Sequence, residues 1–436
     1  MTNSVRFTLL RSNLILYSHN QQSALSSYIQ IDQIIDYKQK ALYFKVHWLY
    51  NRNNKRFSFA KINFTVRRMT MSNELPRTYV PFKDWKEPSK QTEYTEATPL
   101  LNADGTLNAR GWARHNVFQY DRSLVKTERL ISKKEWEYYT VTDGQKQLLI
   151  SFAHVGIGGF MGLRLVDLHT GEVHADGSTI FVGGNKHLPL DRVDIKGRFT
   201  GKEGNTVYDF NTMDTQRDVY FKTIHNNKIL KCNLTMDIPE GLESITTVLP
   251  FKEDNTKFFM TTKQNCMPTS GVFTYGNFTY EFSKDTSFCT LDWGKVNTPR
   301  SLVWYWGSGA DYILDSEGNK HIFGFEITWA IGDESCATET CLFYDGKVHK
   351  IGAVDVEKFP KGRFMEKWKI ISEDGRFNMT MTPIRNNPSD LNLGPVARMN
   401  CNQVYGLWNG NVVLDDGTVL EIKDLFAFCE YVENRW

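Results

Sequence analysis

From Tyr138 onward, the sequence alternates between short runs of β-branched and aromatic residues and dipeptides that favour tight turns. Asp-Gly and Asn-Gly suit hairpin turns because Gly, Asn and Asp tolerate the left-handed backbone conformation. Strands joined by such turns pair antiparallel, since parallel strands need long crossover connections. The pattern therefore predicts an antiparallel sandwich or barrel. Turns are expected at Asp143-Gly144, Asp176-Gly177, Asp345-Gly346, Asp374-Gly375, Asn409-Gly410 and Asp416-Gly417.

The chain of 436 residues is longer than a typical single domain, so we expect two domains with separate cores. Aromatic residues make up 13% of the sequence, and their large flat side chains suit both pleated sheets and ligand pockets. The composition thus favours β-structure over helix.

Two segments show the alternation of a strand directly, because successive side chains of a strand point to opposite faces. Leu302, Trp304 and Trp306 are expected to share one face. In residues 321–330, Glu326 is expected on the face opposite to an apolar one, where it would be a pocket group if that face is enclosed. The apolar face consists of Phe323, Phe325, Ile327 and Trp329.

The formal net charge of +2 hides an asymmetry between the first seventy residues and the rest. Residues 1–70 contain 11 Lys and Arg but only Asp32 and Asp36 as acids, a net charge of +9, which leaves −7 for the remainder. Nucleic-acid binding requires clustered positive charge. A mildly acidic body lacks it, so we expect no nucleic-acid partner.

Residues 1–70 also differ from the body in composition, being rich in Asn, Ile, Lys, Tyr, Phe and Arg. The preferred hypothesis is that translation begins at Met69 or Met71 and that the upstream segment is either poorly ordered or not translated. An organelle-targeting peptide is the alternative. No stretch has the roughly 18–20 apolar residues that span a bilayer, so no transmembrane segment is expected.

Seven cysteines are few for this length and include no Cys-x-x-Cys pair. They are interpreted as buried reduced thiols of a cytoplasmic protein. No metal is expected, because the histidines form no HExxH pattern. No cofactor is expected either, since the glycines of residues 156–162 have the wrong spacing for a dinucleotide-binding loop.

Several strings, in order along residues 98–436, resemble the domain-of-unknown-function family 2804. The most specific is Leu291-Asp292-Trp293-Gly294-Lys295, which leads into Trp304-Tyr305-Trp306-Gly307-Ser308. Other matching strings begin at Leu100, Gly111, Lys134, Phe258, Gly332, Phe343 and Asp374. One departure is Lys295, which stands where the family commonly has Arg and which keeps the charge but loses the bidentate fork.

More distantly, residues 276–294 resemble a segment of AttH-like proteins and carotenoid 1,2-hydratases. The resemblance implies an all-β fold of two lipocalin-like antiparallel β-barrels in tandem. We expect residues 98–267 to form the first barrel and residues 268–436 the second, with residues 1–70 as an extension and residues 71–97 as a lead-in.

Asp292 is the candidate catalytic residue. It lies between Leu291 and Trp293, and apolar surroundings favour the neutral form of a carboxyl, which can then act as a general acid. The alternative is a buried carboxylate that accepts backbone hydrogen bonds at a turn. Trp293, Trp304 and Trp306 are candidates to stack on an apolar or sugar-like ligand, although tryptophans also fill the cores of β proteins.

Four further carboxylates and one cation are candidate ligand-binding residues, because separate strands can bring such groups into one pocket. The alternatives are a turn-capping role for Asp333 and an exposed strand end for Lys263. The five residues are Glu135, Lys263, Glu326, Asp333 and Glu339.

The leading functional hypothesis is binding of a small, partly apolar ligand, such as a lipid-like molecule, in a barrel mouth. A second hypothesis is a cofactor-independent hydratase, lyase or isomerase with Asp292 as general acid. A third is a structural or interaction protein whose barrels are filled by side chains. The decisive observation is whether Asp292, Trp304 and Glu339 line one enclosed cavity.

Overall fold

The computed structural model describes residues 81–436, with gaps at 128, 183–195, 253, 316, 359–360 and 393–396. Of residues 1–80 it describes the backbone of four strands, which form an antiparallel sheet in chain order. They are β1 (Val5–Leu10), β2 (Asn13–Ser18), β3 (Ser27–Asp36) and β4 (Ala41–Leu49). The hypotheses about residues 1–70 otherwise concern a segment outside the described residues, and they stay predictions.

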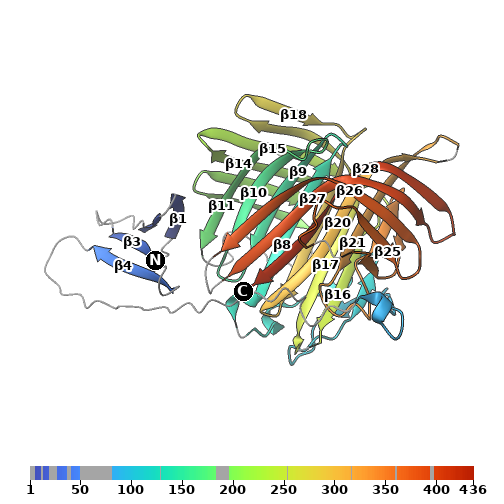
Figure 1. Cartoon of the computed structure of the whole chain (residues 1–436), viewed down its shortest axis with the longest axis horizontal. Coiled ribbons are helices and arrows are strands. Elements are labelled where there is room, and N and C mark those ends of the chain that lie inside the picture. Colours follow the sequence, from blue (N-terminus) through green and yellow to red (C-terminus); the bar gives the residue numbers. More distant parts are fainter. Residues whose placement is uncertain are drawn as a thin grey trace. The chain divides into compact units, whose positions relative to one another are not determined.

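The larger compact unit of the chain contains nearly all of two large antiparallel sheets (Figure 1). The first sheet runs in the order β11 (Val173–Val182), β10 (Gly158–Asp167), β9 (Lys146–His154), β8 (Lys133–Thr142), β19 (Phe288–Asn297), β17 (Asp254–Tyr275), β15 (Lys228–Asp237), β14 (Gln216–His225), β13 (Thr206–Thr212) and β12 (Gly197–Glu203). Additional pairings join β16 (Ile245–Phe251), β18 (Phe278–Phe282) and β6 (Gly111–Ala113) to it.

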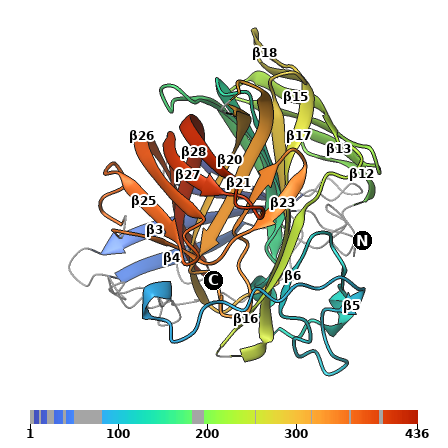
Figure 2. The same cartoon turned by 90° about the vertical axis from the view of Figure 1, so that its right-hand side faces the viewer.

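The second sheet is formed by the C-terminal third of the chain, in orange to red, and lies beside β17 of the first in both views (Figures 1 and 2). Its order is β23 (Lys347–Lys350), β22 (Cys341–Tyr344), β21 (Lys320–Trp329), β20 (Ser301–Leu314), β28 (Val419–Arg435), β27 (Arg398–Val413), β26 (Phe377–Asn392), β25 (Trp368–Ser372) and β24 (Val354–Val356).

The predicted fold class, all-β with two lipocalin-like antiparallel barrels in tandem, is confirmed in the form of a nearly closed barrel followed by a half-barrel. The first sheet curls until β11, at one end, reaches β13, the second strand from the other end: the Thr179 hydroxyl lies 2.5 Å from the Thr206 hydroxyl. In the part of the chain that the structure describes, no helix is long and apolar enough to cross a membrane.

Four of the six predicted turns are confirmed, since Gly144, Gly346, Gly375 and Gly417 lie between consecutive strands and have positive φ. The other two predictions are wrong. Asp176-Gly177 lies inside β11, where a Cβ on Gly177 would come within 2.6 Å of Leu230. Asn409-Gly410 lies inside β27, at a bulge after Trp408. Gly177 leaves room for the Leu230 side chain, and Gly410 lies at a bulge; close contact and bulges are the other roles of glycine in strands.

The change from one sheet to the other falls between β19 and β20, in residues 298–300. The predicted barrel boundary at residue 267 lies instead inside β17, a 22-residue strand that belongs to the first sheet throughout. How the two barrels divide into domains stays a prediction.

The alternation predicted for β21 is confirmed. Phe323, Phe325, Ile327 and Trp329 all belong to the apolar core of the second sheet. Glu326 is buried on the opposite face, which lies against the first sheet.

Asn265 joins the two sheets at a bulge in β17, where the register with β19 shifts between Gln264 and Met267. Its amide nitrogen donates to the Gly309 carbonyl at 3.2 Å and to the Glu326 carboxylate at 2.9 Å. The next residue, Cys266, has φ 62, a strained value for a side chain of this type. Gly324 makes the approach possible, because a Cβ there would lie 2.6 Å from the Cys266 sulfur.

Asn265→Ala should lower the free energy of unfolding by about 2–4 kcal/mol, because each buried polar partner left unsatisfied costs about 1–3 kcal/mol. Urea unfolding of the full chain measures this change. Asn409→Ala, which removes exposed hydrogen bonds to Asp424, is the matched control and should cost less than about 1 kcal/mol. Equal losses in the two variants would contradict a junction role for Asn265.

Candidate functional site between the sheets

Three neighbouring strands of the first sheet place polar side chains on the face that meets the second sheet. Lys263 of β17 is directly opposite Asp292 of β19, and Asp292 is directly opposite Tyr138 of β8. Directly paired residues share a face of the sheet, so these three side chains point the same way. The Tyr138 ring packs edge-on against Trp306 of β20, with ring centroids 5.7 Å apart.

Lys263 is a buried cation at the centre of this face. Its ammonium lies 2.9 Å from the Asp292 carboxylate and 4.2 Å from the centre of the Trp306 ring. Burial lowers the pKa of Lys263, but the charges of Asp292, Glu339 and Glu326 outweigh it and raise that pKa above its usual value. Lys263 therefore stays charged.

Glu326 is fully buried and takes all its partners from side chains. Its Oε1 accepts hydrogen bonds from Ser308 at 2.6 Å and from Asn265, while Oε2 accepts one from the Trp306 indole at 2.7 Å. Burial raises the pKa of Glu326 to about 7, although Lys263 and these hydrogen bonds oppose the rise. The carboxyl therefore titrates near neutral pH.

Glu430 of β28 is a second carboxyl of this kind. It accepts a hydrogen bond from the Trp304 indole at 3.1 Å. Burial raises its pKa to about 7, against the effects of Trp304 and Lys263. Trp304 and Trp306, two residues apart on β20, thus each donate to a buried glutamate.

Glu339 completes the inter-sheet cluster, which we define as Lys263, Asp292, Glu326, Glu339 and Glu430. Its exposed fraction is 1%, yet neither carboxylate oxygen has a hydrogen-bond partner in the described residues. Burial and the charge of Asp292 raise its pKa, against the charge of Lys263. The nearby Thr328 hydroxyl also favours the charged form but does not reach hydrogen-bond geometry.

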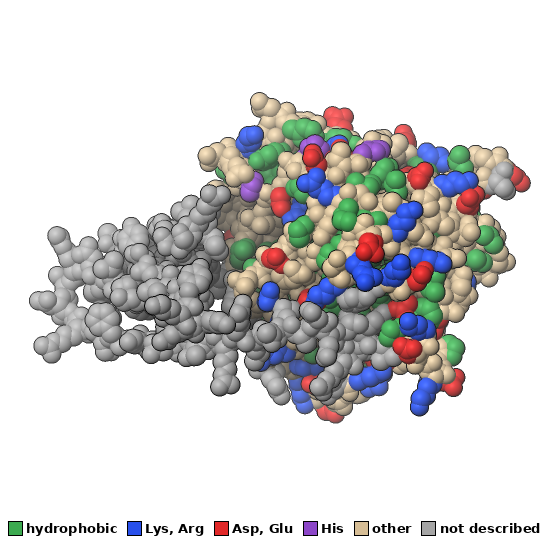
Figure 3. All heavy atoms as spheres, viewed as in Figure 1, with side chains coloured by type: hydrophobic (Ala, Val, Ile, Leu, Met, Phe, Trp, Pro, Cys, Tyr) green, Lys and Arg blue, Asp and Glu red, His purple; other side chains and the backbone are tan. Residues whose placement is uncertain are grey.

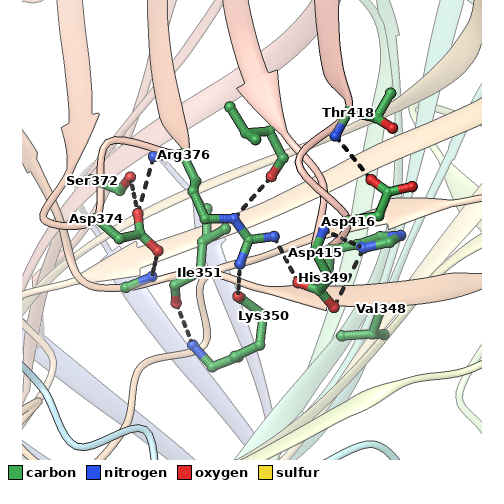
Figure 4. Close-up of polar contacts among 12 residues, drawn as sticks. Val348, His349, Lys350, Ile351, Ser372, Asp374, Arg376, Asp415, Asp416 and Thr418 are labelled. Carbon is green, nitrogen blue, oxygen red and sulfur yellow. Dashed lines mark hydrogen bonds and ion pairs between the residues drawn. The ribbon is translucent and has the colours of Figure 1, made fainter.

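Lys350 fixes the segment that carries Glu339. Its ammonium donates to the Thr338 hydroxyl and to the Thr340 carbonyl, both at 2.9 Å, on either side of Glu339. Part of the side chain reaches solvent, but the ammonium lies among neutral acceptors, and this desolvation lowers the pKa of Lys350 to about 7. Arg376 in turn donates to the Lys350 carbonyl and to Asp415 (Figure 4).

The sequence profile of the family described as Domain of unknown function (DUF2804) matches residues 91–436. The chain belongs to this family. A comparison with curated proteins gives no match.

Solved structures that are similar to this DUF2804 protein include the following two. Kievitone hydratase from Nectria haematococca has 11% sequence identity and a TM-score of 0.39, over 73% of this chain and 92% of that one. A protein assigned as AttH from Nitrosomonas europaea has 12% identity and a TM-score of 0.36, over 70% of this chain and 92% of that one.

The string around Asp292, the most specific part of the resemblance to DUF2804, lies on β19 and splits between two faces. Asp292 faces the second sheet, whereas Trp293 and Lys295 face the barrel interior with Glu137 and Glu135, their register partners on β8. Glu135 there accepts hydrogen bonds from Arg122 and Tyr120. Trp293 and Glu135 are thus not part of the inter-sheet cluster.

Asp333 lies at a turn, where its carboxylate accepts a hydrogen bond from the Ser335 amide at 3.2 Å and lies 3.4 Å from the Lys252 ammonium. These contacts are those of a turn-capping residue, the alternative considered for Asp333. The sequence reasoning missed Glu430, Asn265 and Lys350. A signal existed for Glu430, which is the one carboxylate in the apolar run of residues 425–432 within β28.

The raised pKa of Glu326 predicts a pH dependence of stability. Between about pH 4.5 and 7 the folded chain retains a proton that the unfolded chain releases, so stability falls as pH rises through this window and then levels off. Glu326→Gln should reduce this fall by up to about 3 kcal/mol. Urea unfolding from about pH 4.5 to 8, with the exposed Glu421→Gln as control, measures it. An unchanged slope in Glu326→Gln would contradict the assignment.

The Lys263–Asp292 pair predicts a strong coupling. Asp292→Asn leaves a buried ammonium without its nearest counter-ion and should cost about 3–5 kcal/mol, whereas Lys263→Met combined with Asp292→Asn should recover most of that loss. A double-mutant cycle measured by thermal unfolding tests this. Additive losses would show that the two groups are not coupled.

Proposed function

We propose that this DUF2804 protein binds a small, partly apolar molecule at the inter-sheet cluster and transfers protons to and from it without a cofactor. The reaction class is addition or elimination of water, or isomerisation. The observation that carries the proposal is Glu339, a buried carboxyl with two unpartnered oxygens, within the described residues, beside a buried ammonium. Perturbed carboxyls of this kind concentrate at functional sites.

Each group has a role that its contacts support. Glu339 is the proton donor and acceptor, because its oxygens are not engaged by other side chains of the described chain. Lys263 stabilises negative charge that develops on a substrate oxygen, as fixed cations in dry sites do. Asp292, which the sequence suggested as general acid, acts here as the counter-ion of Lys263.

Glu326 is a second group that can hold a proton, since it titrates near neutral pH. Its oxygens already accept hydrogen bonds from Ser308, Asn265 and Trp306, so it does not contact the substrate directly. Trp306, Tyr138 and Phe428 supply an aromatic surface for the apolar part of the ligand. A lipid-like molecule with one polar group meets these requirements.

Binding without turnover is the second candidate, and the same aromatic surface favours it. On the face shown in Figure 3, Lys and Arg are interspersed with Asp and Glu, and this mixture supports a small ligand rather than nucleic acid. All seven cysteines are free, which supports a reducing compartment such as the cytoplasm.

Solvent deuterium tests the proposal across many compounds at once, because a substrate that receives a proton at carbon in D2O keeps the deuterium there and changes in mass. A library of apolar alcohols and unsaturated carbonyl compounds is incubated in D2O with the full chain and examined by mass spectrometry. A proton that Glu339 takes up from D2O and delivers to carbon is a deuteron, so a substrate should gain deuterium. Glu339→Gln should slow the gain about 100- to 10,000-fold.

Glu421→Gln, at an exposed position of β28, is the control and should exchange at the rate of the unaltered protein. A compound that shifts Trp fluorescence but gains no deuterium would favour binding alone. Undiminished exchange in Glu339→Gln would overturn the assignment of Glu339.

A further inference from the structure

Arg217 is a buried guanidinium inside the first barrel, with an exposed fraction of 1%. It lies on β14 and donates to two neutral acceptors, the Thr212 hydroxyl at 3.1 Å and the Gln264 side-chain carbonyl at 2.9 Å. Its Nε has no hydrogen-bond partner among the described residues. Throughout the described ranges, no carboxylate forms an ion pair with it.

This arrangement leaves a full positive charge without a counter-ion in the described part of the chain. A guanidinium does not lose its proton in a protein, so Arg217 cannot escape the desolvation penalty by becoming neutral. Buried charges are ordinarily paired for this reason. Arg217 therefore presents an unpaired charge and an unused N–H donor in a geometry suited to a carboxylate.

The carboxylates on the same interior face are already engaged. Gln264 is in register with Leu291, and Leu291 with Tyr139, so these three side chains form one row across the sheet. Arg217 contacts this row through Gln264. The Tyr139 hydroxyl donates to Glu137 at 2.7 Å, and Glu135 is held by Arg122. Neither of these contacts supplies Arg217 with a direct partner.

A group of aromatic rings that pack against one another lies on the same interior face as Arg217. Phe210 lies 4.3 Å from Phe152 and 5.9 Å from Tyr139, measured between ring centroids, and Phe221 lies 5.9 Å from Phe152. An apolar molecule is favoured against such surfaces. We propose that the interior of the first barrel binds an amphiphile with an apolar body and one carboxylate, which pairs with Arg217.

This site is separate from the inter-sheet cluster and goes beyond the proposed reaction. Lys263 and Gln264 are adjacent on β17 and point to opposite faces of the sheet, so the two sites do not share a face.

The experiment compares dodecanoate, dodecanol and acetate as probes, with calorimetric titration and thermal unfolding of the full chain. Dodecanoate should bind at least tenfold more tightly than dodecanol and raise the Tm. Arg217→Met should abolish this preference and, without a probe, be at least as stable as the unaltered protein, because it removes an unpaired buried charge. Arg198→Met, at an exposed guanidinium paired with Asp209, is the matched control and should behave like the unaltered protein.

Equal binding of dodecanoate and dodecanol, or a carboxylate preference that persists in Arg217→Met, would overturn the proposal. A stabilisation by acetate as large as that by dodecanoate would show that the site binds a small anion and would overturn the proposal of an amphiphile. If Arg217→Met does not fold, Arg217→Lys serves instead, and it should weaken dodecanoate binding several-fold through loss of the bidentate fork. Glu339→Gln should bind dodecanoate normally, which separates this proposal from the proposed reaction.

Discussion

The burial of one ammonium group between two sheets is the constraint on which the inter-sheet cluster depends. A charge out of water is tolerated only if opposite charges and hydrogen bonds surround it. Lys263 meets this condition with Asp292 on its own sheet and with the Trp306 ring of the other. Because the two sets of partners come from different sheets, the position of Lys263 ties the packing of the sheets to the electrostatics of the cluster.

The bulge in β17 allows the two sheets to pack in this way. Asn265 turns from its own strand to bond Gly309 and Glu326, and the left-handed conformation of Cys266 is the cost of that turn. The strain persists because Gly324 leaves room for it. A bulge next to a cluster of perturbed carboxyls is a common arrangement at functional sites.

Sequence reasoning reached the fold class and part of the cluster because both depend on local patterns. Strand alternation correctly placed Glu326 on the face opposite Phe323 and Phe325. The dipeptides at Asp176 and Asn409 were misread because the glycines serve contacts with distant strands, which local propensity does not encode. Glu135 and Trp293 were grouped with Asp292 since only the register between β8 and β19 shows that they face the barrel interior.

Alternate residues on the same strands of the first sheet therefore face two different environments. On β17, Lys263 faces an excess of carboxyls, while Gln264 faces the unpaired guanidinium of Arg217. A slip of one residue in the pairing of β17 would exchange these side chains, and would bury an ammonium beside Arg217 and remove the cation from four acids. Both errors are costly in a dry interior. The charges on the two faces thus disfavour the wrong register, so the polar groups that form the two candidate sites also help to specify the fold.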